Sequence, residues 1–128
     1  MARRYHIIAA DDDPLYLFVV EQMLATHIPD AAVTAVRSAE EALAVFEERG
    51  ADLVITDHHM PPGMTGLELL RALRARRVAS PVVVVSSDYR IEQEALAAGA
   101  EAFIMKGEPL EALAHRLAGL LQPCSPRH

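Results

Sequence analysis

The sequence predicts an α/β domain in which five parallel strands form one sheet covered by helices on both faces. Five short apolar stretches alternate with longer stretches of helical pattern along the 128 residues. The apolar stretches, such as VVVV, are continuous and lack the apolar–polar alternation of a half-exposed strand. Continuous runs are typical of parallel strands buried on both faces. Connections between parallel strands are right-handed crossovers, so the helices come to cover both faces of the sheet.

Each expected strand is a short run bounded by turn residues or charges. The expected strands are Tyr5–Ala10, Ala32–Val36, Asp52–Thr56, Pro81–Ser86 and Glu101–Met105. We infer a doubly wound sheet with strand order 2-1-3-4-5 in a single three-layer domain, which places the first and third strands side by side. In such sheets ligands bind beyond the carboxyl ends of the strands, where the strand order reverses.

The expected helices begin at capping residues and end at glycine or proline. The first begins at Asp13 and Pro14 and stops before Pro29. The second begins at Ser38, where Glu41 is placed to complete a capping box, and it ends at Gly50. The remaining three run from about Thr65 to Arg77, from about Tyr89 to Ala98, and from Pro109 to Leu121.

Apolar spacing predicts which face of the first and last helices is buried. In the first helix the expected inner stripe consists of Leu15, Phe18, Val19 and Met23. In the last helix the expected stripe consists of Leu110, Leu113, Leu117 and Leu120.

Composition narrows the function classes. At 14.0 kDa the chain has the length of one domain, and a hydrophobic content of 52% supports a packed core. The formal net charge of −6 argues against nucleic acid as a direct partner. Cys124 is the single cysteine, which suits a reducing compartment, and no apolar run approaches the ~18 residues of a membrane span. We therefore expect a cytoplasmic location, with residues 1–121 as the domain and 122–128 as a tail or linker start.

Charged or hydroxyl side chains follow four of the expected strands. IIAA runs into Asp11, Asp12 and Asp13, and LVIT runs into Asp57. VVVV ends at Ser86, and AFIM ends at Lys106, the one lysine among 12 basic residues. Because the carboxyl ends of parallel strands meet at one edge, these groups are expected to converge on one site. A lysine kept in so arginine-rich a chain suggests a need for a compact ammonium group.

A fold tolerates three aspartates at one sheet edge only if some of the carboxylates stay protonated or a cation neutralises them. Two like charges ~4 Å apart repel by roughly 4 kcal/mol at an effective dielectric constant of 20. An open, all-oxygen site of few carboxylates suits Mg²⁺, which keeps several waters and shares a position with substrate phosphate. The alternative is that Asp11, Asp12 and Asp13 only cap the first helix, and Asp13 is the residue best placed for that role.

Asp57 is the candidate nucleophile, since a carboxylate can form an acyl phosphate. Phosphoryl transfer depends on positioning and charge neutralisation. Lys106 supplies a cation for the phosphoryl oxygens, and Ser86 supplies a hydroxyl donor. Taken alone, Ser86 would be interpreted as a turn residue and Lys106 as a solvated side chain. The phosphoryl-transfer interpretation depends on the combination of groups at four strand ends.

The chain resembles a response regulator receiver domain of the two-component signalling family, over residues 5 to about 121. The motifs are the pair Asp11-Asp12 after IIAA, Asp57 before the loop HHMPPGMTG, PVVVVS ending at Ser86, and GAEAFIMK ending at Lys106. They occur in the order and near the spacing of the family. The resemblance implies a flavodoxin-like fold and a signalling switch that is not a turnover enzyme, apart from catalysing its own phosphorylation and dephosphorylation.

The resemblance also implies residue roles. Asp57 would accept a phosphoryl group from a phosphohistidine on a sensor histidine kinase or phosphotransfer protein. Asp12 and Asp57 would bind Mg²⁺ directly, Asp11 through water, and His59 through its backbone carbonyl. Lys106 would pair with the phosphoryl oxygens. Ser86 would swing toward the phosphoryl group and Phe103 would turn inward behind it, reshaping the face made by the fourth helix, fifth strand and fifth helix.

Partners follow from the same resemblance. The output would be a downstream protein or an output domain beyond this chain, with homodimerisation on activation as a further expectation. KGEPLEAL is similar to members that carry a DNA-binding domain downstream. No membrane and no direct nucleic-acid contact are expected.

Departures from the family pattern concern the loops. Pro62 is one extra residue after Asp57, and the stretch from Ser86 to Gly99 is about two residues short. Gly107 stands where many members have proline, so no cis peptide bond is expected after Lys106. Phe103 replaces a commoner tyrosine.

Other interpretations stay open from the sequence. His58 and His59 suggest a transition-metal site, although adjacent residues rarely chelate one ion. His59 and Asp88 are instead candidates for tuning the phosphoryl lifetime. A phosphohydrolase of the haloacid dehalogenase type would use Asp11 and Asp13 as nucleophile and acid. A phosphorylation-independent interaction module and a flavin-binding protein share the fold class.

Overall fold

The computed structural model describes residues 5–121 and contains one five-stranded parallel sheet. The strands are β1 (Tyr5–Ala10), β2 (Ala31–Val36), β3 (Leu53–Thr56), β4 (Val82–Ser86) and β5 (Ala102–Met105). Their order is β2-β1-β3-β4-β5, and every neighbouring pair is parallel. The predicted fold class and strand order are confirmed, and each strand begins within one residue of its expected start.

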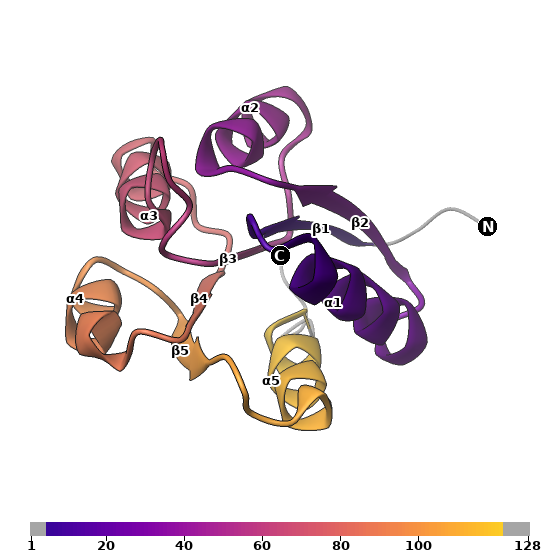
Figure 1. Ribbon diagram of the computed structural model, residues 1–128. Helices are drawn as coiled ribbons and strands as arrows, with labels where there is room; N and C mark the ends of the chain where they lie inside the picture. Colours follow the sequence, from indigo (N-terminus) through magenta and orange to yellow (C-terminus); the bar gives the residue numbers. More distant parts are fainter. Residues whose placement is uncertain (1–4, 122–128) are drawn as a thin grey trace.

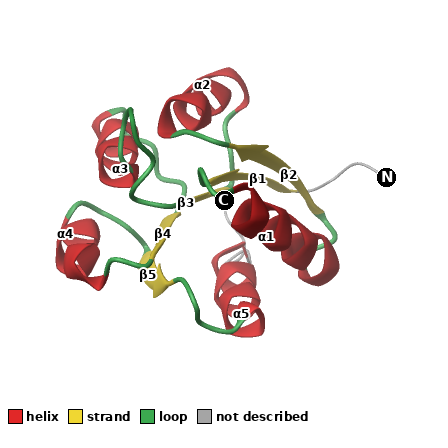
Figure 2. Cartoon of the chain, in the orientation of Figure 1, coloured by secondary structure: helices red, strands yellow, loops and turns green. Residues whose placement is uncertain are grey.

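The helices cover the sheet in two layers. They are α1 (Pro14–His27), α2 (Ala39–Arg49), α3 (Gly66–Ala75), α4 (Glu92–Ala97) and α5 (Leu110–Leu121), and a short 3₁₀ turn, η1 (Tyr89–Ile91), precedes α4. Figure 1 shows α1 and α5 on one side of the sheet and α2, α3 and α4 on the other. The alternation of strands and helices along the chain is visible in Figure 2.

Successive residues of each strand face opposite layers, so the sheet divides the core in two. In β1, Ile7 packs with α1 and α5, whereas Ile8 packs with α2 and α3. In β4, Val83 belongs to the first layer and Val84 to the second. All four side chains are fully buried. Burial on both faces explains why these strands read as unbroken apolar runs.

Side-chain caps fix where the helices begin. The Asp13 carboxylate accepts hydrogen bonds from the backbone N–H groups of Leu15 and Tyr16, at 3.0 and 3.4 Å, and so caps α1 as expected. Ser38 caps α2 by accepting from the Glu41 N–H. The Glu41 carboxylate, however, accepts from the N–H of Arg37 and not from that of Ser38, so the capping box predicted there is incomplete.

The predicted buried stripe of α1 is wrong except at Met23, which is buried, while Val19 is half-buried. Leu15 and Phe18 are 71% and 57% exposed, and the residues that α1 buries are Leu17, Val20, Met23 and Leu24. Apolar residues surround the first turns of this helix, so periodicity alone does not determine how the helix is rotated. Packing against the sheet and α5 decides it. An apolar surface on α1 is left facing outward.

Two backbone features concern the loops at the carboxyl end of the sheet. Among the described residues, the one cis peptide bond joins Pro61 to Pro62. The bond after Lys106 is trans, as the absence of proline there predicts. Gly107 adopts a φ of 101°, in the left-handed region that favours glycine.

Within residues 5–121, none of the helices combines the length and the apolar character that a bilayer crossing requires.

Candidate functional site

Three strands deliver charged side chains to one point at the carboxyl edge of the sheet. Asp11 follows β1, Asp57 follows β3 and Lys106 follows β5. The Lys106 Nζ lies 2.9 Å from Asp11 Oδ2 and 3.1 Å from Asp57 Oδ2. One ammonium group therefore bridges two carboxylates that come from different strands. The expected convergence of these side chains is found in the structure.

Asp12 completes the acidic cluster, which we call the acid cup (Asp11, Asp12 and Asp57). One carboxylate oxygen from each of the three residues lies within 4.8 Å of the others. Asp11 and Asp57 are buried, being 4% and 8% exposed, while Asp12 is half-buried. The donor set is entirely oxygen and more negative than Lys106 can neutralise alone. Such a set fits a hard divalent cation of the Mg²⁺ type.

Burial and charge shift the proton affinities within the cup. The pKa of Asp11 is raised because burial disfavours its charged form, an effect that the hydrogen bond from Lys106 offsets only in part. Burial lowers the pKa of Lys106, but its hydrogen bond to Asp11 and the charges of Asp57 and Asp11 outweigh this, and the net pKa is raised. Lys106 therefore stays charged at neutral pH.

The backbone around Asp57 is fixed on several sides. Its Oδ1 accepts a hydrogen bond from the His58 N–H at 2.7 Å, and its carbonyl oxygen accepts one from the Thr56 hydroxyl at 2.8 Å. The start of α3 packs directly against it, because a Cβ built on Gly66 would overlap the Asp57 carbonyl oxygen. The Gly66 N–H donates to the His58 carbonyl at 2.9 Å and closes the base of the loop.

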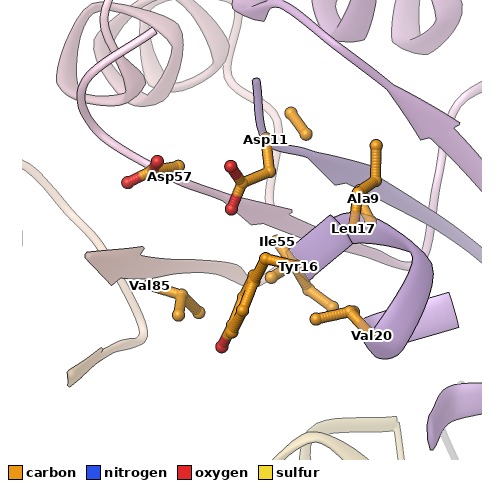
Figure 3. A pocket seen from close by; sticks show the side chains of 9 residues that line it. Ala9, Asp11, Tyr16, Leu17, Val20, Ile55, Asp57 and Val85 are labelled. Atoms are coloured by element: carbon orange, nitrogen blue, oxygen red, sulfur yellow. The ribbon is translucent and has the colours of Figure 1, made fainter. Parts of the chain in front are cut away.

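A small cavity lies beside the cup on the side of α1. Asp11, Asp57 and Tyr16 of α1 are among the residues that line it (Figure 3). The cavity measures about 10 Å³, roughly the room that one water molecule needs. The Lys106 Nζ also lies 4.6 Å from the centre of the Tyr16 ring, within range of a cation–π contact. Tyr16 thus shields the ammonium group from solvent.

Ser86 and Phe103, the two expected switch residues, lie on neighbouring strands, Ser86 at the end of β4 and Phe103 within β5. Ser86 is 1% exposed, and its Oγ accepts a hydrogen bond from the Asp88 N–H at 3.1 Å, so the hydroxyl belongs to the turn after β4. Phe103 is already buried, at 8% exposure, among residues of the α2, α3 and α4 layer. The structure therefore already holds Phe103 in an inward position.

His59, two residues after Asp57, contacts Asp88. The His59 Nε2 lies 3.2 Å from Asp88 Oδ2, and Arg90 donates to Asp88 Oδ1 at 2.9 Å. These two hydrogen bonds, the one from Arg90 being the larger influence, hold the pKa of Asp88 well below its ordinary value. The pairing joins the loop after β3 to the loop after β4.

The neighbouring His58 has a different role. It is 8% exposed, and its Nδ1 accepts a hydrogen bond from the Leu67 N–H at 3.4 Å. Burial, followed by the charge of His59, lowers its pKa. It therefore packs against the start of α3, and its Nδ1 is committed to that contact, which does not support a joint transition-metal site with His59.

Three residues of the site were not anticipated from the sequence. Tyr16 gave no signal, because its contact with Lys106 depends on how α1 is rotated. Arg90 gave none either, since it is 78% exposed and acts only through Asp88. Gly66 could have been found. It is the second residue of the sequence TGLE, in which Thr65 and Glu68 form a complete capping box at the start of α3.

Comparison with known proteins agrees with the fold. The family model of the response regulator receiver domain matches residues 7–118. The two-component response regulator PhoP of Pseudomonas aeruginosa is 38% identical over 95 residues, covering 73% of this chain and 42% of PhoP. The transcriptional regulatory protein TrcR of Mycobacterium tuberculosis is 31% identical over 121 residues, covering 93% of this chain and 46% of TrcR.

A solved structure has a similar fold. The BeF3-activated N-terminal receiver domain of Klebsiella pneumoniae RstA is 28% identical, with a TM-score of 0.83 and coverage of 92% of this chain and 99% of that one.

The chain belongs to the response regulator receiver domain family. Receiver domains are phosphorylation-activated switches of two-component systems, and they interact with histidine kinases or phosphotransfer proteins and often with output domains. The chain spans less than half the length of PhoP and TrcR.

Proposed function

We propose that Asp57 accepts a phosphoryl group from a phosphohistidine donor and that the acylphosphate so formed switches the domain on. In this step an Asp57 carboxylate oxygen attacks phosphorus, a P–O bond forms, the donor's P–N bond breaks, and the leaving imidazole takes up a proton. The observation that supports this most is the Lys106 ammonium group bridging Asp11 and Asp57. It places a fixed positive charge beside the attacking carboxylate, where the phosphoryl oxygens would arrive.

The acid cup is the proposed Mg²⁺ site. Asp12 and Asp57 would hold the ion directly, Asp11 through a water molecule, and His59 through its backbone carbonyl. When bound, Mg²⁺ would neutralise charge on the transferring phosphoryl group and on the cup. The residues fit this role because three carboxylate oxygens already lie within 4.8 Å of one another and exceed the charge of Lys106.

The signal would leave through the face made by α4, β5 and α5. Ser86 would exchange its hydrogen bond with the Asp88 N–H for one to the phosphoryl group, and this would pull the turn before η1 toward the site. Tyr89 and Leu96 are 68% and 40% exposed on the segment that would move. Phe103 is already buried, so its part would be to hold the rearranged turn from behind.

The donor would approach along α1. Leu15 and Phe18 are exposed on α1, and a groove of about 350 Å³, which Leu15 helps to line, runs between α1 and the segment Gly107–Leu110. Exposed apolar surface of this kind is typical of a docking site for a protein. A protein donor is therefore better supported than a free metabolite.

The phosphohydrolase alternative finds less support. It needs Asp13 as a general acid next to Asp11, but Asp13 points its carboxylate at the backbone of α1 as a helix cap. A phosphorylation-independent interaction module is another alternative, and labelling of Asp57 distinguishes it from a phosphoryl acceptor.

The test is intact-protein mass spectrometry after incubation with Mg²⁺ and a small acyl-phosphate donor. We expect one phosphoryl group per chain in the wild type and none in Asp57→Asn. Labelling that persists in Asp57→Asn would reject the assignment. Multiple turnover of a phosphate ester would favour the hydrolase, and no label in either protein would favour the interaction module.

A further inference from the structure

The corner between β2 and α2 contacts both of the loops that carry the acid cup. The Glu40 carboxylate, in the first turn of α2, accepts a hydrogen bond from the Met64 N–H at 2.7 Å, 24 residues away. The Arg37 guanidinium, just before α2, donates to the carbonyl oxygen of Asp12 at 3.3 Å. Met64 belongs to the loop after Asp57, and Asp12 to the loop after β1. The segment Arg37–Glu40 therefore contacts both the loop that carries Asp12 and the loop that follows Asp57.

The loop after Asp57 has a fixed base and a projecting middle. Its base is closed by the Gly66 N–H on the His58 carbonyl, and Met60 is anchored in the core at 2% exposure. Between these anchors lie Pro61 and Pro62, which have no N–H groups to donate. The Met64 N–H is the donor through which the far side of the loop is fastened, and Glu40 is its acceptor.

The loop approaches Glu40 closely because Gly63 has no side chain. A Cβ built on Gly63 would overlap the Glu40 carboxylate. Gly63 does not need glycine for a positive φ, since it is not among the residues with that conformation. Glycine is needed here because it lets the loop backbone approach the Glu40 carboxylate closely. The small residue in the loop therefore suits the acceptor on α2.

Glu40 is presented from a rigid support. Ser38 caps the helix through the Glu41 N–H at 3.1 Å, and Glu41 in turn accepts from the Arg37 N–H at 2.9 Å. Ala39, between them, is completely buried against the sheet layer. A carboxylate mounted on such a helix start has a defined position, which a side chain on a free loop would not have.

We infer that Glu40 is a positioning residue for the proposed Mg²⁺ and phosphoryl site, because it holds the loop of Asp57 and His59 at a fixed spacing from the loop of Asp12. The inference rests on the proposed function for its biological meaning. It concerns a residue outside the acid cup, which acts through the Met64 N–H and touches neither the ion nor the phosphoryl group. Losing the contact lets the loop move, and the cup then binds Mg²⁺ less well.

Three variants separate this positioning role from two simpler explanations, a long-range charge effect and a general loosening of α2. Glu40→Ala removes the acceptor. Glu40→Gln keeps an acceptor oxygen but removes the charge, so it tests whether Glu40 acts only as a distant negative charge. Glu47→Ala removes another glutamate of α2, one that pairs with Arg76 of α3 at 3.0 Å, and so tests whether any loosening of α2 has the same effect.

The measurement is calorimetric titration of Mg²⁺ into the full chain without any phosphoryl donor. We expect Glu40→Ala to weaken Mg²⁺ binding by about tenfold, the lower end for partners that orient metal ligands. The Mg²⁺ affinity of Glu40→Gln should stay within about twofold of the wild-type value, and the affinity of Glu47→Ala should equal the wild-type value. In labelling experiments Glu40→Ala should raise the half-saturating Mg²⁺ concentration and leave the rate at saturating Mg²⁺ nearly unchanged.

Unchanged Mg²⁺ affinity in Glu40→Ala would overturn the inference. So would equal weakening in Glu40→Gln, which would indicate charge alone, or in Glu47→Ala, which would indicate general loosening of α2. The outcome is independent of the proposed function. If wild-type Asp57 takes no label while Glu40→Ala still weakens Mg²⁺ binding, the positioning role stands and phosphoryl acceptance fails.

Discussion

Lys106 and Asp57 are 49 residues apart in the chain, yet the lysine ammonium donates a hydrogen bond to the aspartate carboxylate at 3.1 Å. The sheet brings this about, because β3 and β5 end at the same edge on either side of β4. The same ammonium group also reaches Asp11. Lys106 is thus the internal counter-ion of a cup that holds more negative charge than one cation can balance, and the expected behaviour of the site follows from that imbalance.

Removing one acid should stabilise the metal-free protein. We expect Asp57→Asn to raise the free energy of unfolding by about 1 kcal/mol, or the melting temperature by a few degrees, because like charges in the cup no longer repel. Mg²⁺ at ten times its dissociation constant should stabilise the wild type by about 1.4 kcal/mol. The variant should respond much less. Thermal unfolding with and without Mg²⁺ measures both effects, and an unchanged metal-free melt would mean that the acids do not crowd one another.

Removing the counter-ion should have the opposite effect. Lys106→Met leaves Asp11 and Asp57 buried without a cation, and we expect a loss of about 2–3 kcal/mol in metal-free buffer. Mg²⁺ should restore part of this loss. Lys106→Arg keeps the charge and should retain most of the stability, but its planar guanidinium should slow labelling of Asp57. Urea denaturation and labelling rates test the pair, and equal labelling by Lys106→Arg and wild type would refute the need for a compact ammonium group.

The raised pKa of Asp11 predicts a specific dependence of stability on pH. The folded state keeps Asp11 protonated at pH values above its ordinary pKa of 3.8, at which the unfolded chain has already lost this proton. Asp11 therefore favours folding most at low pH, and this contribution falls as pH rises from 3.8 through the raised folded-state pKa. Metal-free urea titrations from about pH 4 to about pH 7 should show that Asp11→Asn gains stability relative to wild type as pH rises. A difference that does not vary with pH would contradict this.

Gly66 is expected to be irreplaceable because of its contact with Asp57. A Cβ there meets the Asp57 carbonyl, which is backbone and cannot rotate away. We expect Gly66→Ala to destabilise the fold by about 2 kcal/mol and to slow labelling, since Asp57 itself must shift. Gly119→Ala is the matched control, because Gly119 lies in α5 with open space around it. That change should stabilise the protein by about 0.5–1 kcal/mol, and similar effects at the two glycines would rule out the close-contact explanation.

Strand ends were predictable from the sequence, whereas helix orientation and loop contacts were not. Buried parallel strands have one dominant pattern, and the rule that their carboxyl ends share an edge was enough to gather Asp11, Asp57 and Lys106. The rotation of α1 was not predictable, because LYLFVV is apolar on every side and packing alone chooses Leu17 over Leu15. Contacts such as Glu40 with Met64 link the start of a helix to a loop and leave no periodic trace in the chain.

The contact between His59 and Asp88 should set how long the phosphoryl group survives. It joins the loop directly after Asp57 to the loop after β4, so breaking it would loosen the surroundings of Asp57. We expect His59→Ala to shorten the lifetime of the labelled protein by several-fold, because both loops are then free to open. Arg90→Gln is the control, since Arg90 contacts the same carboxylate but does not reach the loop after β3. Decay of the label, followed by mass spectrometry after donor removal, gives the two rates. If His59→Ala decays at the wild-type rate, or if Arg90→Gln accelerates decay as much, the contact between the loops does not limit water access, and the acid cup alone determines the lifetime.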